Sequence, residues 1–157
     1  MPTEIKPGQM APDFDLPTGD GARVRLSDLR GGAVVLYFYP KDDTPGCTTE
    51  AVGFSDRLDA FAAAGATVIG VSKDSPAKHA RFAAKHGLRV RLASDEGGTT
   101  CEDYGVWTEK SMYGRTYMGV ERATFLIGPD GVVREAWRGV KVPGHVDAVL
   151  EAVSRQA

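Results

Sequence analysis

The sequence predicts an α/β fold in which helices flank a mixed β-sheet, with a β-hairpin near the N-terminus. Three observations lead to this prediction. Strand-like and helix-like segments alternate between residues 33 and 87, a strong turn signal occupies residues 128–131, and an amphipathic helix closes the chain. This order is typical of layered α/β domains. The 157 residues are long enough for one core and predict a single domain, 1–157.

The first half of the chain begins with the predicted hairpin. Two short extended segments between Phe14 and Leu26 flank a Thr-Gly-Asp-Gly turn. The run AVVLYFY, residues 33–39, is apolar throughout and too short for a helix, so it is predicted to be a central strand buried on both faces. A helix should begin near Cys47, because apolar residues recur from there at spacings of three and four, with Gly53 as a weak point.

A second strand and helix follow. Residues 67–71, TVIGV, have strand composition, and Ser75 and Pro76 are the expected N-cap and first residue of a helix that ends at Gly87. The polar stretch after this helix contains a short predicted helix at residues 99–104.

The chain closes with a hairpin and a helix. Residues 124–127 and 132–137 are strand-like runs joined by Gly-Pro-Asp-Gly, so they should be antiparallel neighbours. Pro143 is expected to open a final helix with one apolar face, and residues 154–157 are expected to fray. A thioredoxin-like arrangement satisfies this whole order of elements.

Composition narrows the class of function. The formal net charge is −2, and neither a block of like charges nor a basic stripe with aromatic residues is present. Nucleic acid and anionic membranes are therefore poor candidates as partners. The first residues, MPTEIKPGQMAPDF, lack an apolar signal segment, and no run of 18 apolar residues follows, which predicts a cytoplasmic protein.

Cys47 comes directly after the polar loop YPKDDTPG and starts a helix-like segment. If the preceding strand ends at Pro40, this loop lies at the carboxyl edge of the sheet, where open α/β folds bind ligands. Unpaired N–H groups and the helix dipole at that position should stabilise a thiolate. The alternative is a cysteine that is buried only for packing. Thr44 could accept a hydrogen bond from a substrate and donate one to sulfur or oxygen, or serve only as an N-cap.

Pro40, Thr44 and Cys47 match the signature P-x-x-x-T-x-x-C, and on these residues the chain resembles the peroxiredoxins, which are thiol-dependent peroxidases. The longer segments FYPKDDTPGCTTE, YGVW and KSMYGRTYMGVERATFLIGPDG resemble the bacterioferritin comigratory protein branch, also called PrxQ. The resemblance covers nearly the whole chain. It implies an enzyme that needs no cofactor or metal.

The resemblance also implies roles for individual residues. Cys47 would be the peroxidatic cysteine, Thr44 its hydroxyl partner and Pro40 a proline that shields the loop. Arg122, which its own sequence context would place on the surface, would be the arginine of the site. Glu50 would join the polar network around this arginine, and N–H groups near Gly46 and Cys47 would be further donors.

The chemistry requires such donors. A cysteine of ordinary pKa is only about 3% thiolate at pH 7, so a lowered pKa raises the reactive fraction at most roughly 30-fold. Negative charge grows on the departing peroxide oxygen, and each fixed donor aimed at it can contribute on the order of 10² to 10³ in rate. An arginine suits this role because its charge is permanent and its donors form a planar fork.

After reaction with peroxide, the sulfenic acid on the peroxidatic cysteine must be reduced by a second, resolving thiol. This chain has no obvious counterpart of that thiol. The positions at which the branch carries a resolving cysteine are occupied here by Val52 and Ala83, which leaves Cys101. We expect Cys101 to be a packing residue and an external thiol to resolve Cys47: glutathione, a thioredoxin or a glutaredoxin. An intramolecular disulfide between Cys47 and Cys101, reduced by thioredoxin, is the alternative. A monomer or a weak homodimer is expected.

Other classes of function have weaker support in the sequence. A C-x-x-C redox pair and phosphate-binding glycine motifs are absent, and the three histidines, His79, His86 and His145, lack the spacing of metal ligands. They are expected at the surface or on helix faces. A non-catalytic, chaperone-like binding module that keeps the loop as a scaffold is the alternative from another class. The mouth of the pocket is expected to involve Tyr39, Trp107 and Tyr113.

Overall fold

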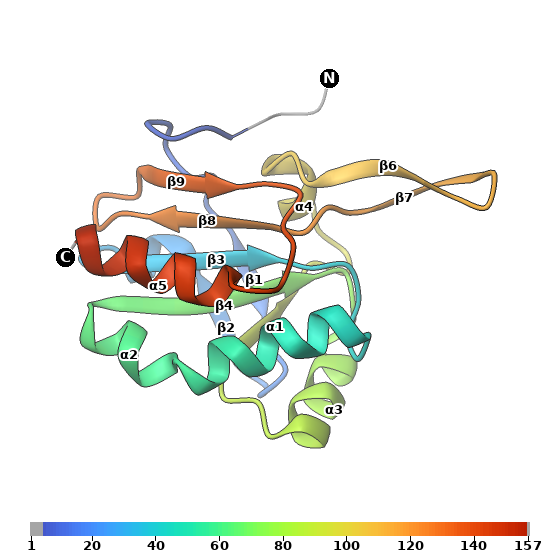
Figure 1. Cartoon of the computed structure of the whole chain (residues 1–157), viewed down its shortest axis with the longest axis horizontal. Coiled ribbons are helices and arrows are strands. Elements are labelled where there is room, and N and C mark those ends of the chain that lie inside the picture. Colours follow the sequence, from blue (N-terminus) through green and yellow to red (C-terminus); the bar gives the residue numbers. More distant parts are fainter. Residues whose placement is uncertain (1–4, 157) are drawn as a thin grey trace.

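The computed structural model describes residues 5–156, which form a mixed β-sheet with helices against it (Figure 1). The sheet has five strands in the order β5-β4-β3-β8-β9. Strands β3, β4 and β5 are parallel, whereas β8 is antiparallel to β3 and β9 is antiparallel to β8. The bounds of the five strands are Ala33–Phe38 (β3), Ala66–Ser72 (β4), Arg91–Ser94 (β5), Ala123–Ile127 (β8) and Val133–Trp137 (β9).

Strand β3 is the centre of this sheet, as its apolar composition predicts. Its side chains alternate between two buried clusters, one on each face of the sheet. Val35 and Tyr37 face the cluster formed with helices α1 (Pro45–Asp56), α2 (Leu58–Ala63) and α5 (His145–Gln156). Leu36 and Phe38 face the N-terminal segment and helix α4 (Thr100–Asp103). A thioredoxin-like mixed sheet with helices on both faces is therefore confirmed, with the short helix α4 and the 3-10 helix at Leu26–Leu29 on the second face.

The predicted N-terminal hairpin is present. Strands β1 (Asp15–Pro17) and β2 (Arg23–Arg25) pair antiparallel and are followed by a short 3-10 helix, η1 (Leu26–Leu29). An isolated bridge between Thr18 and Ala93 joins this hairpin to β5, the outer strand of the sheet.

The helix that follows the polar loop differs from its prediction. It divides into α1 and α2 at Arg57 rather than bending at Gly53. Gly53 lies inside α1, where a Cβ would come within 3.1 Å of Val146 Cγ2. The glycine therefore serves the close packing of α5 on α1, and the break occurs at Arg57, whose backbone leaves helical geometry at φ −98° and ψ 4°.

Helix α3 (Pro76–His86) has the predicted ends. The Ser75 hydroxyl accepts a hydrogen bond from the Lys78 N–H, and Gly87 stops the helix with φ 61°. Helix α5 starts later than predicted, at His145, because Gly144 adopts a left-handed conformation at φ 76°. The expected fraying of residues 154–157 is wrong for Ser154–Gln156, which are helical, and Ala157 lies outside the described residues.

Two features lacked a sequence prediction, strand β5 and a hairpin. The hairpin consists of β6 (Trp107–Met112) and β7 (Arg115–Val120), and it projects from the body of the protein (Figure 1). Both residues of its turn, Tyr113 and Gly114, have positive φ. Nearly all of its residues are exposed or half-buried, so neither face is buried and no alternation of apolar and polar residues marks it in the sequence.

Candidate active site

Cys47 lies in the first turn of α1, directly beyond the end of β3. Thr44 is the N-cap with extended backbone, and Pro45 is the first helical residue. The N–H groups of this first turn have no partner within the helix, and the helix dipole is positive there. Cys47 thus lies at a helix N-terminus, as the sequence predicts.

Arg122 reaches this position through strand pairing. The antiparallel register of β3 and β8 aligns Phe38 with Ala123, so the residue before β8 lies beside the end of β3. From there Arg122 donates a hydrogen bond from Nη2 to the Cys47 sulfur, at 3.4 Å, and another from Nη1 to Glu50 Oε1, at 2.6 Å. The structure therefore brings together the predicted cysteine, arginine and glutamate.

Gly46 is part of the same constellation for a steric reason. A Cβ at this position would lie 3.1 Å from Arg122 Nη2, which is closer than most side-chain contacts. The missing side chain lets the guanidinium lie against the start of α1. Only a small residue is compatible with this approach.

Glu50 is fully buried one turn after Cys47. Its Oε1 accepts from Arg122, while Oε2 has no hydrogen-bond partner among the described residues. Burial raises the pKa of Glu50 to about 7, and the charge and hydrogen bond of Arg122 only partly oppose this shift. Burial also acts to lower the pKa of Arg122, but Glu50 and Cys47 outweigh it and the net shift is upward.

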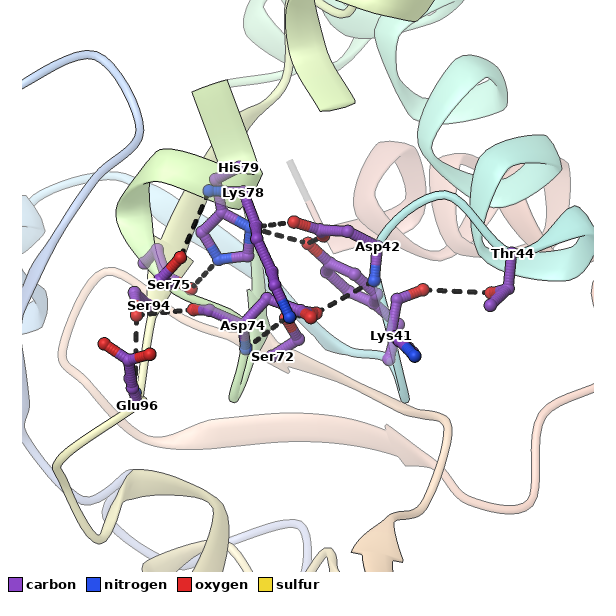
Figure 2. Close-up of polar contacts among 12 residues, drawn as sticks. Lys41, Asp42, Thr44, Ser72, Asp74, Ser75, Lys78, His79, Ser94 and Glu96 are labelled. Atoms are coloured by element: carbon purple, nitrogen blue, oxygen red, sulfur yellow. Dashed lines mark hydrogen bonds and ion pairs between the residues drawn. The ribbon is translucent and has the colours of Figure 1, made fainter. Parts of the chain in front are cut away.

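Thr44 makes a different hydrogen bond from the expected one to the Cys47 sulfur, and Pro40 lies at the surface. The Thr44 hydroxyl donates to the Lys41 carbonyl at 2.9 Å (Figure 2), so its only hydrogen is directed away from the sulfur. Its oxygen keeps the capacity to accept a hydrogen bond. Thr44 is the N-cap by position, yet its side chain makes no capping bond. Pro40 is exposed at the start of the loop.

Access to the sulfur is restricted. Cys47 is only 1% exposed and packs in the apolar cluster that lies between the sheet and α1, α2 and α5. A mostly apolar cleft of about 660 Å³, which Gly46 lines and Cys47 does not, runs between α1 and the segment that leads into α5. Gly46, Val142 and Val146 are among its lining residues. Of the three residues expected at the mouth, Tyr39 is buried, Trp107 is partly buried at the start of β6, and Tyr113 lies at the exposed tip of the β6–β7 hairpin.

Cys101 lies on the opposite face of the sheet. It is fully buried in the cluster with Tyr104 and Phe125, at the start of α4. Asp95 accepts a hydrogen bond from the Cys101 N–H at 2.8 Å. Burial, together with the negative charge of Asp95, raises the pKa of the Cys101 thiol far above its usual range. A disulfide needs Cα atoms within about 7 Å, so pairing with Cys47 would require one thiol to leave its side of the sheet.

Sequence reasoning missed a second layer of the site. Tyr37 is buried, its ring stacks on Phe54 at 4.5 Å, and its hydroxyl has no partner within residues 5–156. Burial, with further contributions from Glu50 and Cys47, raises the pKa of Tyr37 well above its usual value, so the hydroxyl keeps its proton. The sequence signal for a buried Tyr37 hydroxyl was the position of this residue in a strand predicted to be buried on both faces.

Thr124 and His145 form a buried pair near Arg122. Thr124 Oγ1 lies 2.7 Å from His145 Nε2. Burial, assisted by the charge of Arg122, lowers the pKa of His145 to about 4, so this imidazole is neutral at pH 7. The available signal was the spacing of two between Thr124 in β8 and Arg122 directly before it, because residues two apart in an extended chain point to the same side.

The three histidines lie on helices, in line with one of the two expected locations, a helix face. His79 and His145 are buried, and His86 is partly exposed. The sequence did not reveal the contacts that the two buried histidines make across the fold. Within the described part of the chain, no group of three or more His, Cys, Asp or Glu side chains could hold a metal ion. None of the helices in residues 5–156 has the length and apolar character that crossing a bilayer requires.

Comparison with known proteins identifies the family of the chain. The model of the AhpC/TSA family matches residues 7–136. The chain belongs to the AhpC/TSA family. Among curated members, this peroxiredoxin is 51% identical to a putative peroxiredoxin Bcp of Coxiella burnetii, over 93% of this chain and 97% of that protein. It is 45% identical to peroxiredoxin Bcp of Escherichia coli K12, over 98% of each chain.

Solved structures agree with this assignment. A mutant of Xylella fastidiosa PrxQ superimposes with a TM-score of 0.93 at 40% identity, over 98% of each chain. The bacterioferritin comigratory protein of Xanthomonas campestris, studied for alkyl peroxide reduction, gives a TM-score of 0.88 at 42% identity, over 99% of each chain. The predicted resemblance to the PrxQ branch of peroxiredoxins is therefore confirmed.

The raised pKa of Glu50 predicts a pH-dependent stability. Below about pH 4.5 Glu50 is protonated in the folded and unfolded chains alike, whereas between about pH 4.5 and 7 only the folded chain keeps the proton. Relative to Glu50→Gln, the free energy of unfolding of the wild type should therefore fall by roughly 2 to 3 kcal/mol as the pH rises through this window. Urea unfolding at several pH values measures the difference. The exposed Glu151→Gln is the control, and parallel curves for wild type and Glu50→Gln would contradict the prediction.

Proposed function

We propose that this peroxiredoxin reduces hydroperoxides through a sulfenic acid on Cys47, with Arg122 as the main electrostatic catalyst. The observation that carries the proposal is the 3.4 Å contact of Arg122 Nη2 with the Cys47 sulfur at the start of α1. A permanent cation at this distance stabilises the thiolate before reaction and the leaving oxygen during it. The resemblance to an alkyl peroxide reductase of Xanthomonas campestris gives independent support.

In the proposed reaction, the Cys47 thiolate attacks the terminal oxygen of the hydroperoxide. The S–O bond forms as the O–O bond breaks, sulfur is oxidised by two electrons, and the alkoxide or hydroxide that departs takes up a proton. Arg122 and the first-turn N–H groups lie where negative charge develops, and the Thr44 oxygen is oriented to accept from the substrate O–H. Glu50 fixes the guanidinium through its second nitrogen.

We propose that an external thiol resolves the sulfenic acid. The thiol sulfur bonds to Cys47 and water leaves, after which a second thiol reduces the mixed disulfide. The separation of Cys47 and Cys101 by the sheet supports this one-cysteine cycle over the intramolecular alternative. A low-molecular-weight thiol, a glutaredoxin or a thioredoxin could serve as reductant, and a cytoplasmic location would supply it, because thiols stay reduced there. A monomer is sufficient for this cycle.

Hydrogen peroxide and organic hydroperoxides are both proposed substrates. The apolar cleft beside Gly46 supports the second class, because a hydrocarbon tail gains free energy when it leaves water. Val142 borders the cleft on the side of α5.

Substitution of Arg122 tests the electrostatic role. Arg122→Ala should lower kcat/KM for hydrogen peroxide by about 10² or more, which exceeds what a changed thiolate fraction can explain. Arg122→Lys should recover little of the loss, since a lysine cannot contact Cys47 and Glu50 with one planar fork. Cys47→Ser should abolish activity. A loss of only a few-fold in Arg122→Ala would refute the assignment.

The products of a single turnover test the one-cysteine cycle. After one equivalent of peroxide, mass spectrometry should find Cys47 as sulfenic acid, or as a mixed adduct when glutathione is present. Cys101→Ala should keep turnover with the external thiol, because Cys101 remains buried and protonated. Detection of an internal disulfide between the two cysteines as the main product would favour the alternative cycle.

The cleft predicts a change in substrate preference. Val142→Thr keeps the shape of the side chain but adds a hydroxyl, so kcat/KM for cumene hydroperoxide should fall about threefold to tenfold while that for hydrogen peroxide stays nearly constant. Steady-state assays with both peroxides measure this ratio, and the exposed neighbour Lys141→Gln is the control. An unchanged ratio would show that the alkyl group does not use the cleft.

A further inference from the structure

A buried polar cluster outside the thiol site joins the active-site loop to helix α3. Asp42 from the loop and His79 from α3 point toward each other in it (Figure 2). Tyr39, directly after β3, is its third member. Asp42, Tyr39 and His79 are 8%, 1% and 0% exposed. None of these side chains takes part in the chemistry proposed above. Buried ionisable groups are rare unless they are paired, so the cluster calls for a physical explanation.

Every polar group of Asp42 that could hold the loop is engaged. Its Oδ1 accepts from the Tyr39 hydroxyl at 2.6 Å, and its Oδ2 lies 2.6 Å from His79 Nδ1. Its backbone N–H donates to Asp74 Oδ2 at 2.8 Å. Asp74 itself accepts from the Ser72 hydroxyl at the end of β4, at 2.6 Å. Asp42 is therefore tied to the ends of two central strands and to α3 at once.

The contact between Asp42 and His79 must contain a proton. His79 Nε2 lies 3.0 Å from the carbonyl oxygen of Ala93, which can only accept, so Nε2 carries hydrogen. Burial, with the nearby Tyr37 and Asp42, raises the pKa of Tyr39 well above its usual value, so Tyr39 is a donor to Asp42. The remaining 2.6 Å contact, from Nδ1 to Oδ2, is favourable only with a proton between the two atoms.

The contact between Asp42 and His79 lies close in the chain to the residues of the thiol site, so it can affect their positions. Asp42 lies two residues before Thr44, the N-cap of α1, and the Thr44 hydroxyl donates to Lys41. Between them, Asp43 adopts a left-handed backbone conformation at φ 61°, which is uncommon for a residue with a side chain. Such a conformation persists only when its surroundings fix the loop on both sides.

We propose that Asp42 and His79 are positioning residues that strap the active-site loop to α3 and thereby hold Thr44 and the first turn of α1 in the reactive geometry. This inference rests on the proposed function of Cys47 for its kinetic consequence, but the strap itself is a property of the fold. Displacement of catalytic groups by about 1 Å is enough to lower a rate on the order of 10²-fold. A looser loop should also expose the nearly inaccessible sulfur of Cys47.

Three variants test the strap. Asp42→Ala removes both side-chain bonds. Asp42→Asn is the conservative rescue, because its oxygen can accept from Tyr39 while its amide donates to a neutral Nδ1 of His79. Lys85→Gln is the matched control, since Lys85 joins the neighbouring Asp43 to the same helix through an exposed ion pair of 2.8 Å, and such pairs contribute little.

Asp42→Ala should slow sulfenic acid formation by hydrogen peroxide at least about tenfold and, in the opposite direction, speed alkylation of Cys47 by iodoacetamide at least about threefold. Asp42→Asn and Lys85→Gln should stay within about twofold of the wild type in both rates. In ¹⁵N NMR spectra of the imidazoles, Nδ1 of His79 should share a proton in the wild type and become a bare nitrogen in Asp42→Asn.

Unchanged rates of both reactions in folded Asp42→Ala would overturn the proposal, as would an Asp42→Asn variant as impaired as the alanine variant, or a bare Nδ1 in the wild type. If Asp42→Ala does not fold, the double variant Asp42→Ala/His79→Leu replaces the pair by apolar groups and carries the same expectations. Alkylation and NMR report on the strap even if the wild type consumes no peroxide, which separates failure of this inference from failure of the proposed function.

Discussion

The guanidinium of Arg122 is the group on which the site depends. It contacts the Cys47 sulfur with one nitrogen and the Glu50 carboxylate with another, so two buried acidic groups on one helix share a single cation. Without it, burial would penalise any negative charge on either group. The planar fork of arginine makes both contacts from one position, and the register of β3 against β8 determines that this position lies beside the start of α1.

The site also carries unsatisfied polar atoms. Glu50 Oε2 and the Tyr37 hydroxyl are buried without hydrogen-bond partners among the described residues, although such atoms are normally paired in a folded protein. Burial, assisted by Arg122, also lowers the pKa of His145 to about 4, so this residue lowers stability only when the pH falls below its ordinary pKa of about 6.5. Several buried polar atoms without partners around one thiol are typical of a functional site, where groups that the reaction needs are kept although they lower the stability of the fold.

The central sheet separates the two cysteines chemically as well as spatially. Cys47 has a cation and a helix N-terminus beside it, whereas Cys101 has the carboxylate of Asp95 and an apolar surrounding. Burial and Asp95 raise the pKa of the Cys101 thiol, so the two thiols of the chain have different surroundings although neither is exposed. In the polar loop between β3 and α1, Thr44 bonds back to Lys41 next to the start of α1, whereas Asp42 faces α3.

The sequence by itself determined the order of strands and helices, the central place of residues 33–38, and the position of Cys47 at a helix start, because these follow from periodicity, turn residues and capping preferences that act over a few residues. It could not reveal the exposed β6–β7 hairpin, which buries no face, or the split of the first helix at Arg57. Only the tertiary structure decided that Arg122 meets Cys47, that Cys101 lies across the sheet, and that His79 reaches the loop. Each of these contacts joins residues far apart in the chain, and strand register and helix packing, which no local pattern encodes, set their distances.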